Sequence, residues 1–196
     1  MIGRGQITLG ILAGGRALRL GGVDKAFAEY RGQSLLARTL DAMGEGFCET
    51  LVSHPGNEPR LVRMPLRAVS DRRADFPGPL AGIEALLHAA RSPWLLTLPV
   101  DVRDIPPGLC QSLCDAAIGP GVVVQDAQGL QPIVGLWRVD AVRPAVTAAL
   151  DSGQLAAHRL VSLLGLEIHD ISPLRLGNLN TPADFEPMDK QPMDSQ

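Results

Sequence analysis

Short apolar runs along the chain alternate with segments in which apolar residues recur every three or four positions. The short runs predict buried strands at residues 7–12, 50–53, 66–69 and 94–100. The recurring pattern predicts helices between them, with Ser34 as an N-cap for LLARTLDAM and with Pro79 and Pro107 in the first turns of two further helices. Strands that alternate with helices in this way predict a mainly parallel sheet with helices on both faces.

The second half of the chain adds a different pattern. Strands at 122–125 and 132–138 flank a turn at 126–129, which predicts a β-hairpin. Helices follow at 141–150 and 156–164, then a last strand at 166–171 and a short helix that begins at Thr181 and Pro182. The expected fold class is therefore α/β, in three layers.

Length and composition limit the class of protein. The 196 residues are 45% apolar and 20% charged, which is typical of a globular chain and excludes a coiled coil or a disordered protein. We expect one domain over residues 1–186, followed by a polar, disordered tail at 187–196. The cysteines Cys48, Cys110 and Cys114 are too few for a disulfide framework and are not spaced for a zinc site, so we expect a cytoplasmic protein.

The charge balance narrows the range of partners. Lys and Arg number 18 and Asp and Glu 21, which gives a net charge of −3. A nucleic-acid or membrane-surface protein would carry a broad basic face, so we expect neither partner. A single nucleotide needs only a few local donors and is compatible with this charge. No apolar run approaches the roughly 20 residues of a membrane span, and the apolar start of the chain fits a first strand better than a signal peptide.

The loop after the first predicted strand is a candidate anion site. It reads LAGGRALRLGGVDK over residues 12–25. Gly14 and Gly15 allow backbone amides to approach an anion, and Arg16, Arg19 and Lys25 add positive charge. The loop has neither the Walker A nor the G-x-G-x-x-G pattern, but its glycines and cations after a buried strand indicate a phosphate-binding loop.

Two aspartates join this loop at one edge of the predicted sheet. Asp71 and Asp101 each follow a predicted strand, and ligands of such sheets bind outside the carboxyl ends of the strands. A carboxylate in this position can hold Mg²⁺ through one oxygen while the ion keeps waters and nucleotide phosphates. Asp101, just past the most apolar run, is therefore the candidate metal ligand.

The same loop resembles the signature L-A-G-G-x-[SA]-x-R-[ML]-G-x-D-K of nucleotidyltransferases of the molybdenum cofactor guanylyltransferase type. Four further segments resemble this family in the same order, namely DFPGPLAGI at 75–83, LPVD at 98–101, QPIVGL at 131–136 and NLNTPADF at 178–185. The resemblance extends over nearly the whole chain, although its first motif alone is shared with other sugar-nucleotide and cytidylyl transferases. It implies a Rossmann-like fold and transfer of GMP from magnesium GTP to the terminal phosphate of molybdopterin, with release of pyrophosphate.

The resemblance also implies roles for individual residues. Lys25 would neutralise the triphosphate, Arg19 the charge that develops on pyrophosphate, and Asp101 would bind the Mg²⁺ ion. The implied nucleotide contacts are Leu12, Ala13, Gly14, Gly15, Lys25, Asp71 and Asp101, and the implied pterin contacts are Gly78, Gly82, Asn178 and Asn180. Ser53 stands where the family commonly has Asn. The implied partners are GTP and molybdopterin as substrates, with other cofactor-maturation proteins and apo-molybdoenzymes as further candidates.

Two alternatives stay open at this point. A cytidylyltransferase or a sugar-phosphate nucleotidyltransferase would share the fold, although cytidylyl relatives tend to have L-A-A-G where this chain has LAGG at 12–15. A non-catalytic carrier of the finished cofactor belongs to another class. Such a carrier would have no need for Arg19, Lys25 and Asp101 together, because it does not stabilise a leaving pyrophosphate.

Overall fold

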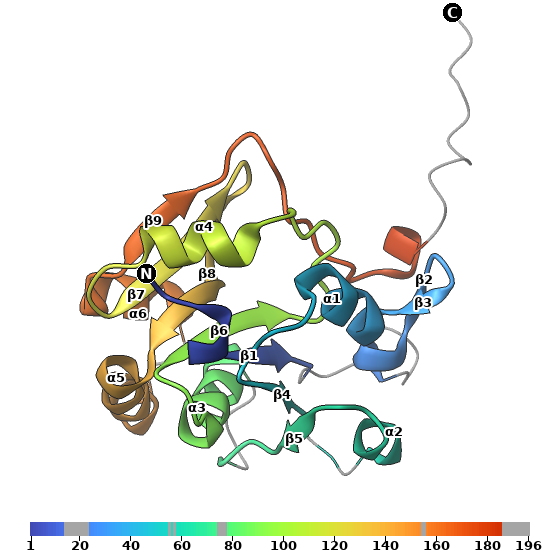
Figure 1. Ribbon diagram of the computed structural model, residues 1–196, viewed down its shortest axis with the longest axis horizontal. Helices are drawn as coiled ribbons and strands as arrows, with labels where there is room; N and C mark the ends of the chain where they lie inside the picture. The colour runs from blue at the N-terminus through green and yellow to red at the C-terminus, as the bar shows by residue number, and fades with distance from the viewer. Residues whose placement is uncertain (14–23, 55, 57, 74–77, 154–155, 186–196) are drawn as a thin grey trace, which may run out of the picture.

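A seven-stranded sheet forms the centre of the molecule (Figure 1). The computed structural model of the chain describes residues 1–13, 24–54, 56, 58–73, 78–153 and 156–185. The strand order is β5-β4-β1-β6-β8-β7-β9. The strands are β1 (Ile7–Leu12), β4 (Glu49–Ser53), β5 (Arg67–Val69), β6 (Trp94–Pro99), β7 (Gly121–Asp126), β8 (Gly129–Arg138) and β9 (Glu167–Asp170). Only β8 runs antiparallel to its neighbours in this sheet, so the predicted mainly parallel α/β fold is confirmed.

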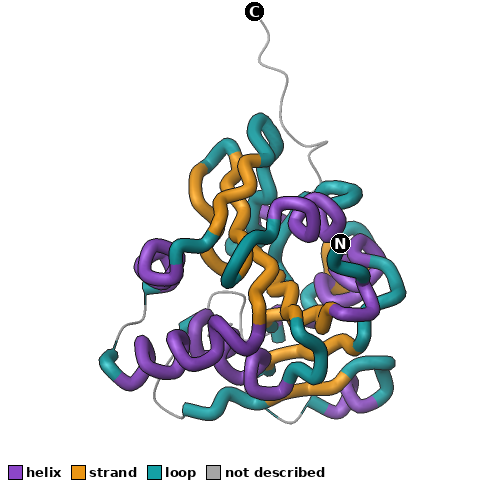
Figure 2. The backbone as a smooth tube through the Cα atoms, turned by 60° about the vertical axis from the view of Figure 1, so that its left-hand side comes forward, coloured by secondary structure: helices purple, strands orange, loops and turns teal. Residues whose placement is uncertain are grey.

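Helices cover both faces of the sheet, which gives the three layers predicted (Figure 2). Alternate residues of β1 face one cluster of buried side chains that includes α1 (Leu35–Met43) and α4 (Leu109–Ala116). A second cluster includes α3 (Pro79–Ala89), α5 (Val139–Asp151) and α6 (Ala157–Leu164). No helix among the described residues is long and apolar enough to cross a membrane.

Several local predictions can be compared directly with the structure. The Ser34 hydroxyl accepts the amide of Ala37 at 3.3 Å, as expected of the N-cap of α1. The β7–β8 hairpin is present, with a register shift between Val123 and Val124. Helix α4 begins at Leu109 and not at Pro107, because Gly108 adopts a left-handed conformation (φ 79°) that no helical turn contains.

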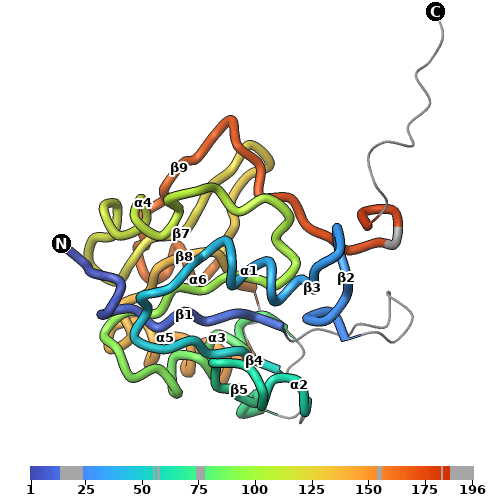
Figure 3. Tube along the Cα trace, turned by 45° about the vertical axis from the view of Figure 1, so that its right-hand side comes forward, coloured from blue at the N-terminus to red at the C-terminus, as the bar shows by residue number. Residues whose placement is uncertain are grey.

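Short elements were not predicted. They are the strands β2 (Glu29–Tyr30) and β3 (Gln33–Ser34), the helix α2 (Pro59–Val62) and the 3₁₀ turns η1 (Arg4–Gln6) and η3 (Lys25–Phe27). The turn η4 (Pro182–Phe185) corresponds to the short helix predicted at Pro182. Figure 3 shows the β2–β3 hairpin and this C-terminal segment at the end of the molecule toward which β1 runs. There the rings of Tyr30 and Phe185 meet edge to face, with centroids 6.1 Å apart.

Candidate functional site

The carboxyl ends of four parallel strands, β1, β4, β5 and β6, meet at one edge of the sheet. Backbone hydrogen bonds continue past the strand ends: Ala13 to Ser53 (3.0 Å), Val100 to Leu12 (3.0 Å) and His54 to Val69 (2.9 Å), in each case from amide to carbonyl. The first residues beyond the strands are therefore fixed relative to one another. This edge carries the functional residues predicted at strand ends.

Three predicted site residues from distant parts of the chain meet here. The Lys25 ammonium donates to Oδ2 of Asp101 at 2.6 Å and to Oδ1 of Asn180 at 2.8 Å. The second contact joins residues 155 positions apart in the sequence. The Lys25 and Asp101 side chains are 22% and 17% exposed, so the pair is accessible to a ligand and yet shielded on most sides. An ammonium has three N–H donors, and two of them have partners among the described residues, so the third can donate to a phosphate oxygen.

Local structure explains how Lys25 and Asp101 come together. Lys25 is the first residue of η3, and the Asp24 carboxylate caps that turn by accepting the amide of Ala26 at 3.0 Å. Asp101 lies two residues beyond the end of β6, the buried strand that pairs with β1. The cap of η3 and the end of β6 thus orient two opposite charges toward each other.

The C-terminal segment supplies Asn180. Leu176 and Leu179 are buried, and the amides of Arg103 and Leu179 donate to the carbonyls of Gly177 (3.2 Å) and Asp101 (3.0 Å). Asn178 forms an isolated antiparallel bridge with Val102, and its own side chain lies at an exposed position. The residues directly after Asp101 therefore fix the segment that ends at Asn180.

Asp184 orders the turn at Asn180, and the predictions did not include this residue. Its Oδ2 accepts the amides of Asn180 (2.9 Å) and Thr181 (2.7 Å) and the Thr181 hydroxyl (2.9 Å), and these bonds hold the pKa of Asp184 below its ordinary value. The sequence did contain a signal for this contact, because Thr-Pro-Ala-Asp fits the capping-box spacing at the start of a helix.

The other side of the edge contains Ser53 and Asp71. The Ser53 hydroxyl donates to Oδ1 of Asp71 at 3.2 Å. Burial raises the pKa of Asp71 above its ordinary value, and the bond from Ser53 offsets part of that effect. Ser53, the last residue of β4, is itself buried, and its hydrogen bond links β4 to Asp71, two residues beyond the end of β5.

Gly82 lies in α3 and Gly78 directly precedes it, and the two glycines have different surroundings. A Cβ at Gly82 would lie 2.9 Å from Cδ2 of Leu12 and 2.9 Å from Oγ of Ser53. Glycine at 82 thus allows α3 to approach the ends of β1 and β4 closely, which is a packing reason separate from the pterin contact expected there. Gly78 precedes α3 at an exposed position, where an added Cβ would meet nothing within 4 Å.

Four residues given a role in the predicted anion-binding loop lie outside the part of the chain that the structure describes, namely Gly14, Gly15, Arg16 and Arg19. The expected tail, 187–196, also lies outside it. Leu12 and Ala13 are described, and both are buried at the carboxyl end of β1. The residues that the structure brings into contact are therefore Lys25, Asp101 and Asn180 on one side and Ser53 and Asp71 on the other.

The carboxylate of Asp101 suits a magnesium ion bound mainly by ligand phosphates and water. Within the described ranges, Oδ2 accepts from Lys25 and nothing donates to Oδ1. The same residues contain no group of three or more His, Cys, Asp or Glu side chains placed to hold a metal. Magnesium in nucleotide sites commonly uses one or two carboxylates together with phosphate oxygens and water, so this donor set fits the ion.

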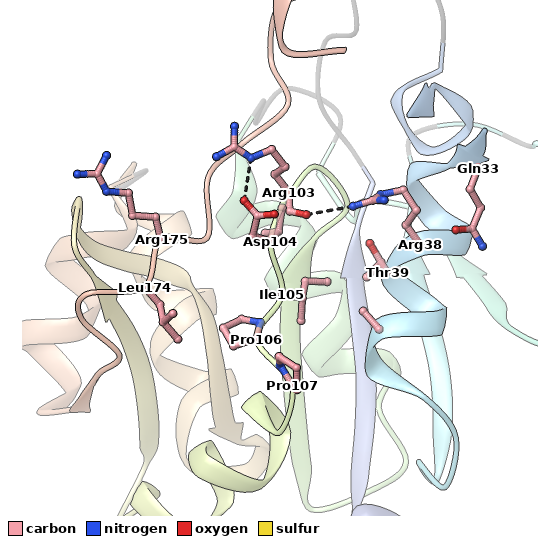
Figure 4. A pocket seen from close by; sticks show the side chains of 12 residues that line it. Gln33, Arg38, Thr39, Arg103, Asp104, Ile105, Pro106, Pro107, Leu174 and Arg175 are labelled. Atoms are coloured by element: carbon pink, nitrogen blue, oxygen red, sulfur yellow. Dashed lines mark hydrogen bonds and ion pairs between the residues drawn. The ribbon is translucent and has the colours of Figure 1, made fainter. Parts of the chain in front are cut away.

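A separate cavity of about 420 Å³ opens between α1 and residues 102–107 (Figure 4). Arg38, Arg103 and Arg175 lie on its walls. Two of these guanidinium groups already have protein partners, since Arg38 donates to the carbonyl of Arg103 at 3.1 Å and Arg103 to Asp104 at 2.8 Å. No predicted site residue lines this cavity, so it is distinct from the Lys25–Asp101–Asn180 contact.

A mainly parallel sheet with a lysine–aspartate pair at its carboxyl edge, in a chain whose sequence is glycine-rich after the first strand, is typical of α/β nucleotidyltransferases. The chain belongs to the family of the MobA-like NTP transferase domain, which matches residues 9–167. It is 35% identical over 179 residues to the molybdenum cofactor guanylyltransferase of Pseudomonas syringae, covering 88% of each chain. It is 34% identical over 161 residues to the Bordetella pertussis protein of the same name, covering 79% of this chain and 81% of that protein.

Solved structures confirm the fold. The molybdopterin-guanine dinucleotide biosynthesis protein A of Archaeoglobus fulgidus superposes with a TM-score of 0.74 at 19% identity, over 91% of this chain and 94% of that one. A nucleotidyl transferase of Methanothermobacter superposes with a TM-score of 0.69 at 21% identity, over 92% and 94%. A cytidylyltransferase of Thermus thermophilus superposes with a TM-score of 0.63, so the fold alone does not distinguish the nucleotide.

Proposed function

We propose that this protein is a molybdenum cofactor guanylyltransferase, which transfers GMP from GTP to the terminal phosphate of molybdopterin. The observation that carries the proposal is the contact among Lys25, Asp101 and Asn180 at the carboxyl edge of the sheet. The full-length similarity to guanylyltransferases supports the choice of guanine over cytosine. The LAGG sequence at 12–15 supports the same choice.

The reaction explains why these groups are needed. An oxygen of the acceptor phosphate attacks the α-phosphorus of GTP, a new P–O bond forms, and the bond to pyrophosphate breaks. Both reactants are anions, so the protein must position them and neutralise their charge. Lys25 donates its free N–H to the triphosphate, and Arg19 neutralises the leaving pyrophosphate. Asp101 holds Mg²⁺, which supplies positive charge to the phosphate oxygens when bound.

The remaining site residues are assigned to the two substrates as the family resemblance implies. Leu12, Ala13, Gly14 and Gly15 present main-chain groups to the guanine nucleotide, and Asp71, next to Ser53, contacts the guanosine. Gly78, Gly82, Asn178 and Asn180 are the residues that we assign to the pterin, as the family resemblance implies. Because Oδ1 of Asn180 accepts from Lys25, its amide N–H groups are the ones available to a pterin. Residues 1–186 form the single nucleotidyltransferase domain, which acts in the cytoplasm and passes its product to other maturation proteins or apo-molybdoenzymes.

Calorimetric titration with GTP, CTP and ATP, each with and without Mg²⁺, tests the proposal. We expect GTP to bind at least about tenfold more tightly than CTP or ATP, with an affinity that Mg²⁺ increases. Formation of pyrophosphate from GTP and molybdopterin then tests the transfer itself. Preference for CTP would contradict the guanylyl assignment and keep the reaction class, whereas nucleotide binding without turnover would favour the carrier.

A further inference from the structure

His54 is a buried titratable side chain to which the proposed reaction gives no role. It follows Ser53 directly at the end of β4, and its side chain is 10% exposed. Burial of an imidazole costs free energy unless both ring nitrogens find hydrogen-bond partners. The partners of His54 therefore indicate what the residue does.

Each ring nitrogen of His54 has a partner. Nε2 lies 2.8 Å from Oδ2 of Asp24, to which it donates. Nδ1 lies 3.0 Å from the carbonyl oxygen and 3.2 Å from the amide nitrogen of Gly56. A neutral ring accepts from that amide at Nδ1, and a protonated ring donates to that carbonyl. The bond from Nε2 to Asp24 is therefore compatible with both charge states of the ring.

Asp24 connects His54 to the phosphate-binding lysine. One carboxylate oxygen of Asp24 caps η3 through the amide of Ala26, and the other accepts from His54. Lys25 lies between Asp24 and Ala26, as the first residue of that turn. The orientation of the turn, and with it the direction of the Lys25 side chain, thus depends on a bond to the end of β4.

Arg60, in α2, adds further contacts to Asp24 and to the turn η3. Its guanidinium lies 3.7 Å from the ring centroid of Phe27 in η3 and 3.9 Å from Oδ2 of Asp24, and Glu58 pairs with it at 2.7 Å. Arg60 is half exposed, so its contribution is weaker than that of the buried His54. Within the described ranges, the charged groups around His54 are accordingly Asp24, Glu58 and Arg60.

We infer that His54 is a positioning residue, which acts through Asp24 to hold Lys25 in place for the nucleotide triphosphate. The inference rests on the proposed function, because it assumes that Lys25 binds a triphosphate. Asp24 belongs to the family signature G-x-D-K in this sequence, and the bond to His54 gives that aspartate a physical role. Lys25 is then fixed from two directions, by Asp24–His54 on one side and by Asp101 and Asn180 on the other.

Two substitutions of similar size separate the ring nitrogens of His54. In His54→Gln, the amide nitrogen is three bonds from Cβ, as Nε2 is, so it can donate to Asp24. In His54→Asn, the amide nitrogen is two bonds from Cβ, as Nδ1 is, so it can reach Gly56 and not Asp24. We expect His54→Asn to weaken GTP binding about tenfold, and His54→Gln to restore it to within about threefold of wild type, measured by calorimetry with Mg²⁺.

The same substitution in a Lys25→Met background tests whether the effect passes through Lys25. There we expect His54→Asn to change GTP affinity by less than about twofold, because the group that it positions is gone. Arg67→Ala serves as a control for general loss of stability. It breaks the ion pair with Glu49, at 2.8 Å between β5 and β4, and should lower the unfolding temperature without changing GTP affinity.

The outcomes separate this inference from the proposed function. A full tenfold loss in the Lys25→Met background would show that His54 acts without Lys25, and equal affinities for His54→Asn and His54→Gln would show that the bond to Asp24 is irrelevant. Either result overturns the inference and leaves the guanylyl assignment intact. If the wild type instead prefers CTP, the guanylyl assignment fails, and the same comparison made with CTP decides the role of His54.

Discussion

Asp101 and Asp126 both lie at the carboxyl end of a strand, yet their surroundings are opposite. Asp126, the last residue of β7, is 2% exposed and accepts hydrogen bonds from the amides of Gln128 and Leu176 and from the side chain of Gln131. Asp101 accepts from Lys25 alone through its carboxylate, and one oxygen has no donor among the described residues. A satisfied, buried carboxylate is a structural group, whereas a carboxylate with an open oxygen can bind a ligand.

This difference separates the two halves of the sheet. Around β1, β4, β5 and β6, the strands are parallel and their carboxyl ends converge, so polar residues just past them share one edge. In the antiparallel β7–β8 hairpin, the strand end leads directly into a turn, and Asp126 stabilises that turn and the segment at Leu176. We therefore propose that the same residue type serves chemistry in one half, and it supports the fold in the other.

Substitution of Asp101 should have the largest effect, and it should fall on activity. Asp101→Asn keeps the size of the side chain but removes the charge that would hold Mg²⁺ and pair with Lys25. We expect turnover to fall by at least about 10³-fold. The partly exposed ion pair contributes little to stability, so the unfolding temperature should change by no more than about 4 °C. Pyrophosphate release and thermal unfolding measure the two effects, and near-normal turnover would refute the metal assignment.

Substitution of Asp126 should show the reverse pattern. Asp126→Asn replaces one acceptor by an N–H₂ group that faces backbone donors, so we expect a loss of about 2–3 kcal/mol in the free energy of unfolding. Turnover per folded molecule should stay within about twofold of wild type, because the segment that ends at Asn180 is still fixed by its backbone bonds to the residues around Asp101. Urea unfolding and an activity assay on the same preparation measure both quantities, and a loss of turnover at full folding would contradict the distinction.

The pH dependence of this stability difference follows from the pKa of Asp126. Burial by itself would raise this pKa, but the hydrogen bonds from Leu176, Gln128 and Gln131 together lower it by more. The pKa of Asp126 in the folded protein is therefore below its ordinary value of 3.8. A lowered folded-state pKa adds stability that is fully present above the unfolded-state value and is lost as pH falls through the folded-state value. The difference between wild type and Asp126→Asn should therefore be constant near neutral pH and shrink below about pH 4.

The contrast between these aspartates also shows what the sequence could reveal. Asp101 was predicted as a site residue because it follows the apolar run at 94–100, and the same reasoning placed Asp71 at the sheet edge. The structural role of Asp126 was not predicted, since its partner Leu176 lies 50 positions away. Contacts between distant residues leave no local pattern, and for this reason the bond of His54 to Asp24 was also missed.

Element length decided how well the fold could be predicted. Runs of four to seven residues that are rich in apolar side chains, such as those at 7–12, 66–69 and 94–100, predict buried strands. The two-residue strands β2 and β3 contain no such run, and their turn has φ values of 54° at Arg31 and 78° at Gly32. Glycine favours such a conformation and arginine rarely adopts it, so the local sequence gave only half of the signal.

Asp71 is less buried than Asp126 and, like Asp101, accepts one side-chain hydrogen bond, in this case from Ser53. The substitution Gly82→Ala tests the importance of that bond and should have the smallest effect of those proposed. The new Cβ would lie 2.9 Å from Oγ of Ser53, which must turn away from Asp71. The strain, about 1–3 kcal/mol, is partly offset by the better helix propensity of alanine, about 1 kcal/mol, so stability should fall by no more than about 2 kcal/mol. GTP affinity should fall about threefold to fivefold, because the Asp71 carboxyl loses its hydroxyl donor.

Ser53→Ala removes that hydroxyl directly and should match Gly82→Ala in GTP affinity by calorimetry. A normal affinity for Ser53→Ala would show that Asp71 needs no such donor, and the effect of Gly82→Ala would then come from packing against Leu12.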